Sequence, residues 1–330
     1  MRLRLLAAAA IVLVALPALA ADLGMKVTKR IPGPDGGWDY VNVSADGRTM
    51  LVSRADGVMT IDLASGAVNP HLVAAARTHG AVTVPNSKVG MVTSTTSGGA
   101  LLFDAATGAV TATIKTGTKP DAAAYDPATG MLLVMDNAGG GVAVIDPKTQ
   151  TLIGTVAVAG ALESAAVDGK GRLYVNVEDK GEIAVIDVAA RKVLRTIKLV
   201  DCDEPGGLAL TRQGYLIAAC ANGRAKVVEA KSGKLRADIA IGAGPDAVIY
   251  DAPRDRAYVP TGRDGALTAI DTTGVPHGIG VVPTQKGART GAIDPATGNV
   301  YLPTARFAAA EAGQRPKAVP GSLEVLVVGR

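Results

Sequence analysis

The residues best suited to chemistry in this sequence recur at one place in a repeating unit. When the repeats described below are aligned, the start of each unit falls on one of seven positions, six of which carry a charged or ligating side chain. These positions are Asp39, His79, Asp121, Glu163, Gly206, Asp246 and Arg289. Glu204, just before Pro205, could supply the side chain that Gly206 lacks. Carboxylate oxygens and one imidazole could hold a divalent cation with positions left open for water.

Three interpretations of this ring remain open: a solvated polar rim, a ligand site without a metal, and a metal site. The metal interpretation uses His79, Asp121, Glu163 and Asp246. His79 matters most, because His71 and His277 fall in predicted outer strands. We predict a binding or interaction protein that engages an unknown small molecule or periplasmic protein on the face bearing this ring. The alternative is a metal-dependent hydrolase or lactonase at the same place.

The ring depends on a repeat that runs through almost the whole chain. An acidic residue ends every third predicted strand and precedes a turn: Asp62, Asp104, Asp146, Asp187, Glu229 and Asp271. Successive members are 41 or 42 residues apart, which is the length of one four-stranded propeller blade. An Asp in such a turn accepts hydrogen bonds from backbone N–H groups two residues on. We therefore interpret these acids, and also Asp126 and Asp294, as structural.

One unit displays all four predicted strands. Residues 120–160 contain short apolar or alternating runs at 122–125, 131–135, 141–145 and 151–158. Equivalent units span residues 38–73, 79–115, 162–199, 205–241 and 245–282. The last unit has two strands in residues 292–303 and a third at 322–328, and residues 25–31 would pair with it as the fourth.

These units predict an all-β fold: a seven-bladed β-propeller of four-stranded blades, closed by an N-terminal strand. Such closure removes the exposed sheet edges that template aggregation. An open solenoid would need polar capping repeats, and none is visible. We expect a single domain over residues 21–330.

The first twenty residues are typical of a signal peptide. Arg2 and Arg4 precede an apolar run at residues 5–16, and Ala18-Leu19-Ala20 offers a small-x-small cleavage site. No later apolar run of about 18 residues is free of turn residues, so we predict no transmembrane segment. The mature protein should be periplasmic, soluble and monomeric.

Composition and motifs exclude several function classes. Without Arg2 and Arg4, 32 basic and 30 acidic residues remain, and the lysines are scattered, which argues against a nucleic-acid partner. The sequence has no G-x-S-x-G elbow, haem attachment motif, phosphate loop or zinc-type cysteine cluster. The single Trp38 argues against quinone-cofactor propellers. These absences leave a divalent cation at the ring as the one candidate cofactor, and it depends on the metal interpretation of the ring.

Two further features bear on the predicted ring. Cys202 precedes the first strand of the fifth unit and Cys220 ends its second, so both should lie at one end of adjacent strands. A disulfide is the favoured interpretation in an exported protein, over a free pair or a metal site. Residues 305–321 insert about 14 extra residues into the last unit. This insertion could be a lid over the ring or could project into solvent.

Several second strands resemble those of the YVTN-repeat β-propeller family. The matching segments are LYVN at 173–176, AYVP at 257–260 and VYLP at 300–303, with VIDP and VIDV at two turns. The resemblance covers roughly residues 26–330 and implies a propeller that is often exported or surface-located. Its motif consists of core and turn residues and carries no chemistry. Related propellers include haem d1 domains, lactonase-like metal hydrolases and streptogramin lyases, and lyase chemistry uses more than one His around the channel.

Overall fold

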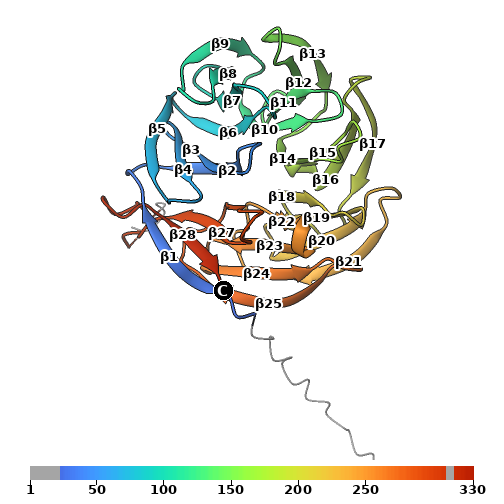
Figure 1. The fold of residues 1–330 in the computed structure, drawn as a ribbon. Helices are drawn as coiled ribbons and strands as arrows, with labels where there is room; N and C mark the ends of the chain where they lie inside the picture. Colours follow the sequence, from blue (N-terminus) through green and yellow to red (C-terminus); the bar gives the residue numbers. More distant parts are fainter. Residues whose placement is uncertain (1–22, 310–315) are drawn as a thin grey trace, which may run out of the picture.

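Seven β-sheets surround a central axis in the computed structural model, which describes residues 23–309 and 316–330 (Figure 1). Each sheet has four antiparallel strands. Two short 3-10 helices, Glu178–Lys180 and Ala252–Arg254, are the helical segments of the described ranges. The predicted seven-bladed β-propeller is confirmed. The predicted signal peptide, residues 1–20, and the centre of the 305–321 insertion lie outside the described residues.

Blades 1 to 6 each use four consecutive strands, with the first nearest the axis (Figure 1). Blade 1 contains β2 (Trp38–Val43), β3 (Thr49–Arg54), β4 (Gly57–Asp62) and β5 (Val68–Ala74). Blade 2 contains β6 (Thr78–Thr83), β7 (Val89–Ser94), β8 (Gly99–Asp104) and β9 (Val110–Lys115). Blade 3 contains β10 (Pro120–Asp126), β11 (Met131–Asp136), β12 (Gly141–Asp146) and β13 (Thr151–Ala157).

The next three blades repeat this order. Blade 4 contains β14 (Leu162–Val167), β15 (Arg172–Val177), β16 (Glu182–Asp187) and β17 (Lys192–Lys198). Blade 5 contains β18 (Pro205–Leu210), β19 (Tyr215–Cys220), β20 (Arg224–Glu229) and β21 (Leu235–Ala240). Blade 6 contains β22 (Ile249–Asp251), β23 (Arg256–Thr261), β24 (Ala266–Asp271) and β25 (His277–Pro283).

Blade 7 joins the two ends of the chain. It contains β26 (Ala292–Ile293), β27 (Val300–Thr304), β28 (Glu324–Gly329) and, as its outer strand, β1 (Lys26–Pro32). β1 is antiparallel to β28 (Figure 1). The predicted closure by an N-terminal strand is confirmed, with bounds one residue later than predicted.

The strands of one blade differ in burial, and the residue types explain why. Leu132 to Met135 in β11 are fully buried, because the second and third strands pack on both faces against neighbouring blades. In the outer strand β13 only Val156 is buried. Each fully buried Leu or Val contributes about 1.5–3 kcal/mol of hydrophobic stabilisation. The inner strands therefore hold the blades together and place the first strands around the channel.

Two further expectations concern local features of the fold. Cys202 and Cys220 form the predicted disulfide, with their Cα atoms 5.2 Å apart. Within the described residues, none of the helical segments has the length and apolar character needed to span a bilayer.

Candidate functional site

The ring predicted from the repeat lies at one end of the first strands, here called the channel mouth. In blades 1 to 5 the register between the first and second strand shifts near this end. The first residue inside each shift is Asp39, His79, Asp121, Glu163 or Gly206. A β-bulge re-aims a side chain out of the regular alternation, which presents these residues to the mouth. In blades 6 and 7, Asp246 and Arg289 precede first strands that are short.

Side chains of neighbouring blades hold the backbone of the mouth residues. The Thr93 hydroxyl donates to the carbonyl of Asp121 (2.5 Å). The Thr290 hydroxyl, from blade 7, donates to the carbonyl of Asp39 (2.9 Å). Because these bonds cross between blades, the positions of the mouth residues depend on the closed ring.

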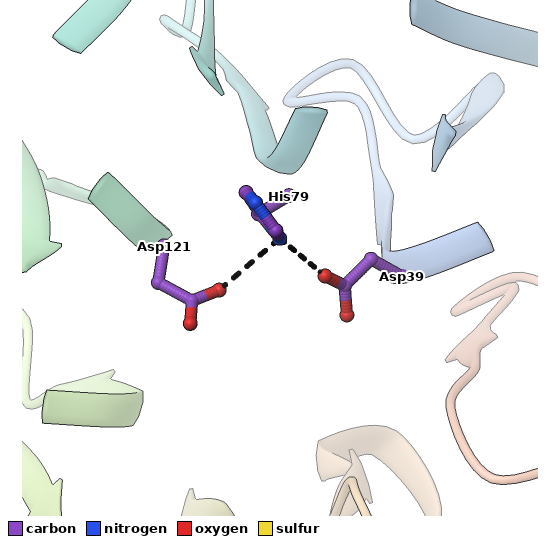
Figure 2. Close-up of side chains that lie close together, drawn as sticks. All are labelled: Asp39, His79 and Asp121. Atoms are coloured by element: carbon purple, nitrogen blue, oxygen red, sulfur yellow. Dashed lines mark hydrogen bonds and ion pairs between the residues drawn. The ribbon is translucent and has the colours of Figure 1, made fainter. Parts of the chain in front are cut away.

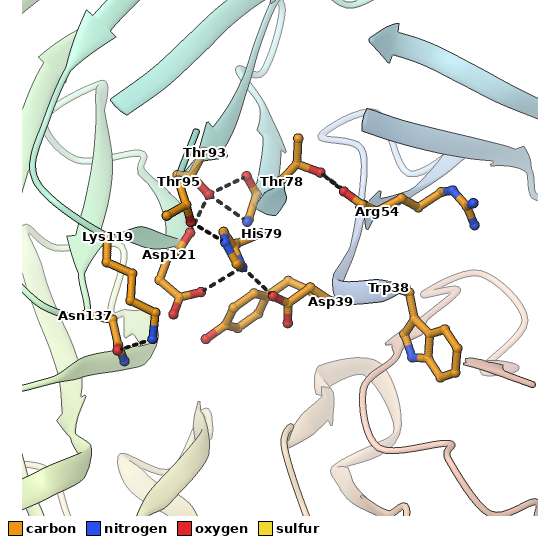
Figure 3. Close-up of polar contacts among 12 residues, drawn as sticks. Trp38, Asp39, Arg54, Thr78, His79, Thr93, Thr95, Lys119, Asp121 and Asn137 are labelled. Carbon is orange, nitrogen blue, oxygen red and sulfur yellow. Dashed lines mark hydrogen bonds and ion pairs between the residues drawn. The ribbon is translucent and has the colours of Figure 1, made fainter. Parts of the chain in front are cut away.

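Three of the predicted residues come together on one side of the axis. Asp39, His79 and Asp121 each offer a ligand atom, and these atoms lie within 4.8 Å of one another (Figure 2). Nδ1 of His79 is 2.6 Å from Oδ2 of Asp39 and 3.6 Å from Oδ1 of Asp121. Nε2 of His79 is 2.6 Å from the Thr95 hydroxyl (Figure 3). The imidazole is therefore oriented by an oxygen at each nitrogen.

Asp121 differs from the other two in its surroundings. Its side chain is 7% exposed, against 27% for Asp39 and 18% for His79. Among the described residues no group donates a hydrogen bond to the Asp121 carboxylate, whose one charged contact is the 3.6 Å approach of His79 (Figure 2). Buried carboxylates are normally paired or hydrogen-bonded, so this group lacks the partners that its burial calls for.

Glu163 belongs to a second group that crosses the channel. The hydroxyl of Tyr40, from blade 1, donates to Oε2 of Glu163 in blade 4 (2.7 Å). The Asn137 amide donates to Oε1 of Glu163 (2.8 Å). Figure 3 shows the next contact, in which Nζ of Lys119 donates to the Asn137 oxygen (2.5 Å). Tyr40 also lines the channel cavity of about 280 Å³, together with small side chains such as Ala165. Tyr40 therefore stands between the polar mouth and the channel behind it.

Asp246 and Arg289 form the third group. Nε of Arg289 donates to Oδ2 of Asp246 (2.8 Å), and the Arg289 guanidinium lies 5.8 Å from the centroid of the Trp38 ring. A Cβ on Gly206 would lie 3.3 Å from Oδ1 of Asp246, so the glycine leaves space for this carboxylate. Glu204 is exposed. Burial, followed by the negative charge of Glu204, raises the pKa of Glu178.

The four residues named for a metal site thus fall into three groups. His79 and Asp121 lie together with Asp39, whereas Glu163 is bonded to Tyr40 and Asn137, and Asp246 is paired with Arg289.

Burial and crowding of acids set the electrostatics of the mouth. Burial, followed by the negative charge of Asp39, raises the pKa of the Asp121 carboxyl to about 7. Burial, followed by the charge of Asp121, raises the pKa of Glu163 to about 9, although the bond from Tyr40 opposes this shift. Partial burial also raises the pKa of Asp246, against the effect of Arg289. The mouth therefore holds protons that exposed carboxyls would release.

The pKa of His79 is also raised, but by the neighbouring carboxylates and not by burial. Burial would lower the pKa of His79, but its hydrogen bond to Asp39 and the charges of Asp121 and Asp39 raise it overall. Carboxylates beside an imidazole favour its charged form. The imidazole thus serves as the local counter-charge to two acids.

Sequence reasoning missed the residues that follow the second strands. Thr95, Asn137 and Glu178 each come directly after such a strand, in blades 2, 3 and 4. They are 42 and 41 residues apart, so the repeat contained the signal for a second polar ring. Tyr40 had no such signal, because nothing in a single strand shows that its side chain crosses to blade 4.

The described parts of the 305–321 insertion lie beside the mouth at the join of blades 7 and 1. Phe307 bridges to Ala318, and its ring centroid lies 6.4 Å from that of Trp38. The backbone N–H of Gly321 donates to the Asp35 carboxylate. The described residues therefore contact the rim through Trp38.

Comparison with known proteins supports the fold alone. No protein-family model matches the chain, and no curated protein matches it. Solved structures do match, among them hydrazine synthase of Kuenenia stuttgartiensis, with a TM-score of 0.71 and 15% sequence identity. That match covers 82% of this chain and 92% of the other. At this identity the likeness shows a shared propeller architecture and carries no statement about activity.

Proposed function

We propose that this protein is an exported binding protein that takes a small, positively charged ligand at the channel mouth. A propeller is a rigid scaffold on which such a site can be built from several blades. Signal peptide, periplasmic location, monomeric state and membership of the YVTN-repeat family remain predictions.

One observation carries this proposal: acidic side chains from four blades converge on the mouth and outnumber the cations there. The acids are Asp39, Asp121, Glu163 and Asp246, and the nearby cations are His79, Lys119 and Arg289. Burial and mutual repulsion raise the pKa of Asp121 and of Glu163. A bound cation would stabilise the ionised carboxylates in two ways: it would replace the water that burial removes, and it would offset the repulsion between the acids.

The test compares four-carbon ligands that differ in charge. Butane-1,4-diamine should raise Tm by about 3 °C at about ten times its Kd, whereas butane-1,4-diol and butanedioate should not. Trp38, the single tryptophan of the chain, lies under Arg289 and provides a fluorescence signal for occupancy of the mouth. Divalent cations form a second arm of the same screen.

Two variants locate the response. Glu163→Gln should abolish the effect of the diamine, and Asp62→Asn, at an exposed turn, should retain it. If no cation of either class changes Tm or Trp38 fluorescence, the proposal is wrong.

A metal-dependent hydrolase or lactonase remains a second candidate. The approach of Asp39, His79 and Asp121 favours it, since two carboxylates and one imidazole leave coordination positions for water and substrate. Its test is turnover of a lactone and ester panel by zinc-loaded protein. Activity that survives Asp121→Asn would reject this mouth as the catalytic site.

A further inference from the structure

We propose that Asp39, His79 and Asp121 form a binding site for one divalent metal ion, of the class of Zn²⁺ or Mn²⁺. This inference deepens the proposed function, because it rests on the channel mouth taking up cations, and it names the cation and its ligands. Glu163 and Asp246 are outside the ligand set.

The first support is the position of the ligand atoms. Nδ1 of His79 and one oxygen of each aspartate lie within 4.8 Å of one another, so one ion can reach all three with small side-chain rotations (Figure 2). Bonds of such an ion to imidazole nitrogen and carboxylate oxygen are about 2.0–2.2 Å long. The ion would take the place of the close contact between His79 and Asp39.

The second support is the unpaired Asp121 carboxylate. Its side chain is 7% exposed, and within the described ranges no N–H or O–H donates to it. Figure 2 shows it aimed at the imidazole of His79. Burying a carboxylate without hydrogen bonds costs folding free energy, and coordination of a cation would supply the missing partner.

The third support is the group on the far side of the imidazole. The Thr95 hydroxyl lies 2.6 Å from Nε2 of His79, where it can accept the second ring N–H (Figure 3). A metal-bound histidine typically donates its other ring N–H to an oxygen, which leaves the first nitrogen unprotonated for the metal. Thr95 is thus a positioning residue for the site.

The ligand set and its place in the fold define the class of ion. An imidazole ligand favours Zn²⁺ over Ca²⁺, and two carboxylates keep Mn²⁺ within range. The three ligands come from blades 1, 2 and 3, on one side of the axis. The remaining coordination positions would face the opposite blades, where Glu163 and Asp246 lie.

The test measures metal binding by the mature full-length protein after removal of metals with a chelator. Titration calorimetry with ZnCl₂ and with MnCl₂ should show one ion per chain, and CaCl₂ should bind more weakly. Asp121→Asn and His79→Gln should each lower affinity by more than about 100-fold, and Thr95→Val by about 10- to 100-fold. Pulsed electron paramagnetic resonance of the Mn²⁺ complex should show coupling to an imidazole nitrogen that His79→Gln removes.

Matched controls keep the outcome decisive. Asp62→Asn carries the same chemical change as Asp121→Asn at an exposed turn and should bind the metal as the unmodified protein does. Circular dichroism and Tm of each variant show whether it is folded. Folded Asp121→Asn with unchanged metal affinity, or the absence of any metal binding, would overturn the inference. Binding of butane-1,4-diamine without metal binding would overturn this inference alone, whereas loss of both responses would overturn the proposed function as well.

Discussion

Six blades carry an acid at the turn end of their third strand and four carry one at the channel mouth, and the acids of the two ends behave in opposite ways. At the turn end, the Asp62 carboxylate accepts hydrogen bonds from the backbone and hydroxyl of Ser65, and the hydroxyl bond leads in lowering its pKa. Asp104 accepts from the backbone of Thr107, which lowers its pKa likewise. At the mouth end, burial raises the pKa of Asp121 and of Glu163.

The difference shows that the role of an acid in this repeat depends on the donors around it. A tight turn directs backbone N–H groups at the acid that begins it, so the charge is satisfied locally. A bulged first strand aims its acid at the axis, where burial and the charges of other acids raise the pKa of Asp121 and of Glu163. The turn acids thus stabilise the fold, whereas burial of the mouth acids costs stability.

The largest expected effect comes from the covalent link at the mouth end. The Cys202–Cys220 disulfide ties down a loop with left-handed residues at Asp201 (φ 53°) and Glu204 (φ 42°), a conformation that costs energy in non-glycine residues. The double variant Cys202→Ala/Cys220→Ala should lose about 3 kcal/mol of unfolding free energy in urea titration. Reduction of the unmodified protein should give a similar loss. Equal stability in all three samples would show that the mouth end does not depend on this link.

A turn acid should show the opposite behaviour to a mouth acid. Asp126 is fully buried and accepts hydrogen bonds from the backbone of Ala128 (3.3 Å) and from the hydroxyl of Thr129 (2.6 Å). Asp126→Ala should destabilise the protein by about 2 kcal/mol, because it leaves these donors without an acceptor. Urea unfolding gives the stability, and Trp38 fluorescence should show an unchanged response to cations. A lost cation response in folded Asp126→Ala would mean that the two ends are coupled.

Neutralising a mouth acid should stabilise the protein. Because the pKa of Glu163 is raised to about 9 when folded, the folded protein retains a proton that the unfolded chain releases above its ordinary value. The free energy of unfolding should therefore fall as pH rises from about 5 towards 9. Glu163→Gln should weaken this fall and raise stability at about pH 8 by about 1 kcal/mol.

Urea midpoints of both proteins at about pH 5 and about pH 8 test this sign. The glutamine keeps an oxygen for the amide of Asn137 and can donate to the hydroxyl of Tyr40, so the geometry of the contact is preserved. If Glu163→Gln is less stable than the unmodified protein at both pH values, the Glu163 carboxyl stabilises the fold as the turn acids do.

Much of the fold could be predicted because its information is local and repeated. Each blade is a set of four adjacent strands, so the 41- or 42-residue period of the turn acids predicts both the blade and the number of copies. The closing strand could be predicted because residues 25–31 had no blade of their own. The Cys202–Cys220 pair followed from adjacent antiparallel strands.

The candidate site could be predicted only in outline. The repeat places Asp39, His79 and Asp121 at equivalent positions, but it does not show which neighbours approach. Glu163 occupies the same position in the repeat, yet it accepts a hydrogen bond from Tyr40 across the channel and does not join these three residues. Which mouth residues contact one another depends on the length and direction of their side chains, and the spacing of the repeat does not predict either.

By itself, the sequence determined a closed ring of seven blades, because the repeat defines each blade and leaves residues 25–31 as a strand without a blade of its own. The same repeat predicted which residues stand at the mouth. The tertiary structure alone decided which acids have hydrogen-bond donors and which have other acids as neighbours. The physical reason is that bulges aim the mouth residues into a space shared by blades distant in sequence. There, burial and charge depend on all the blades at once.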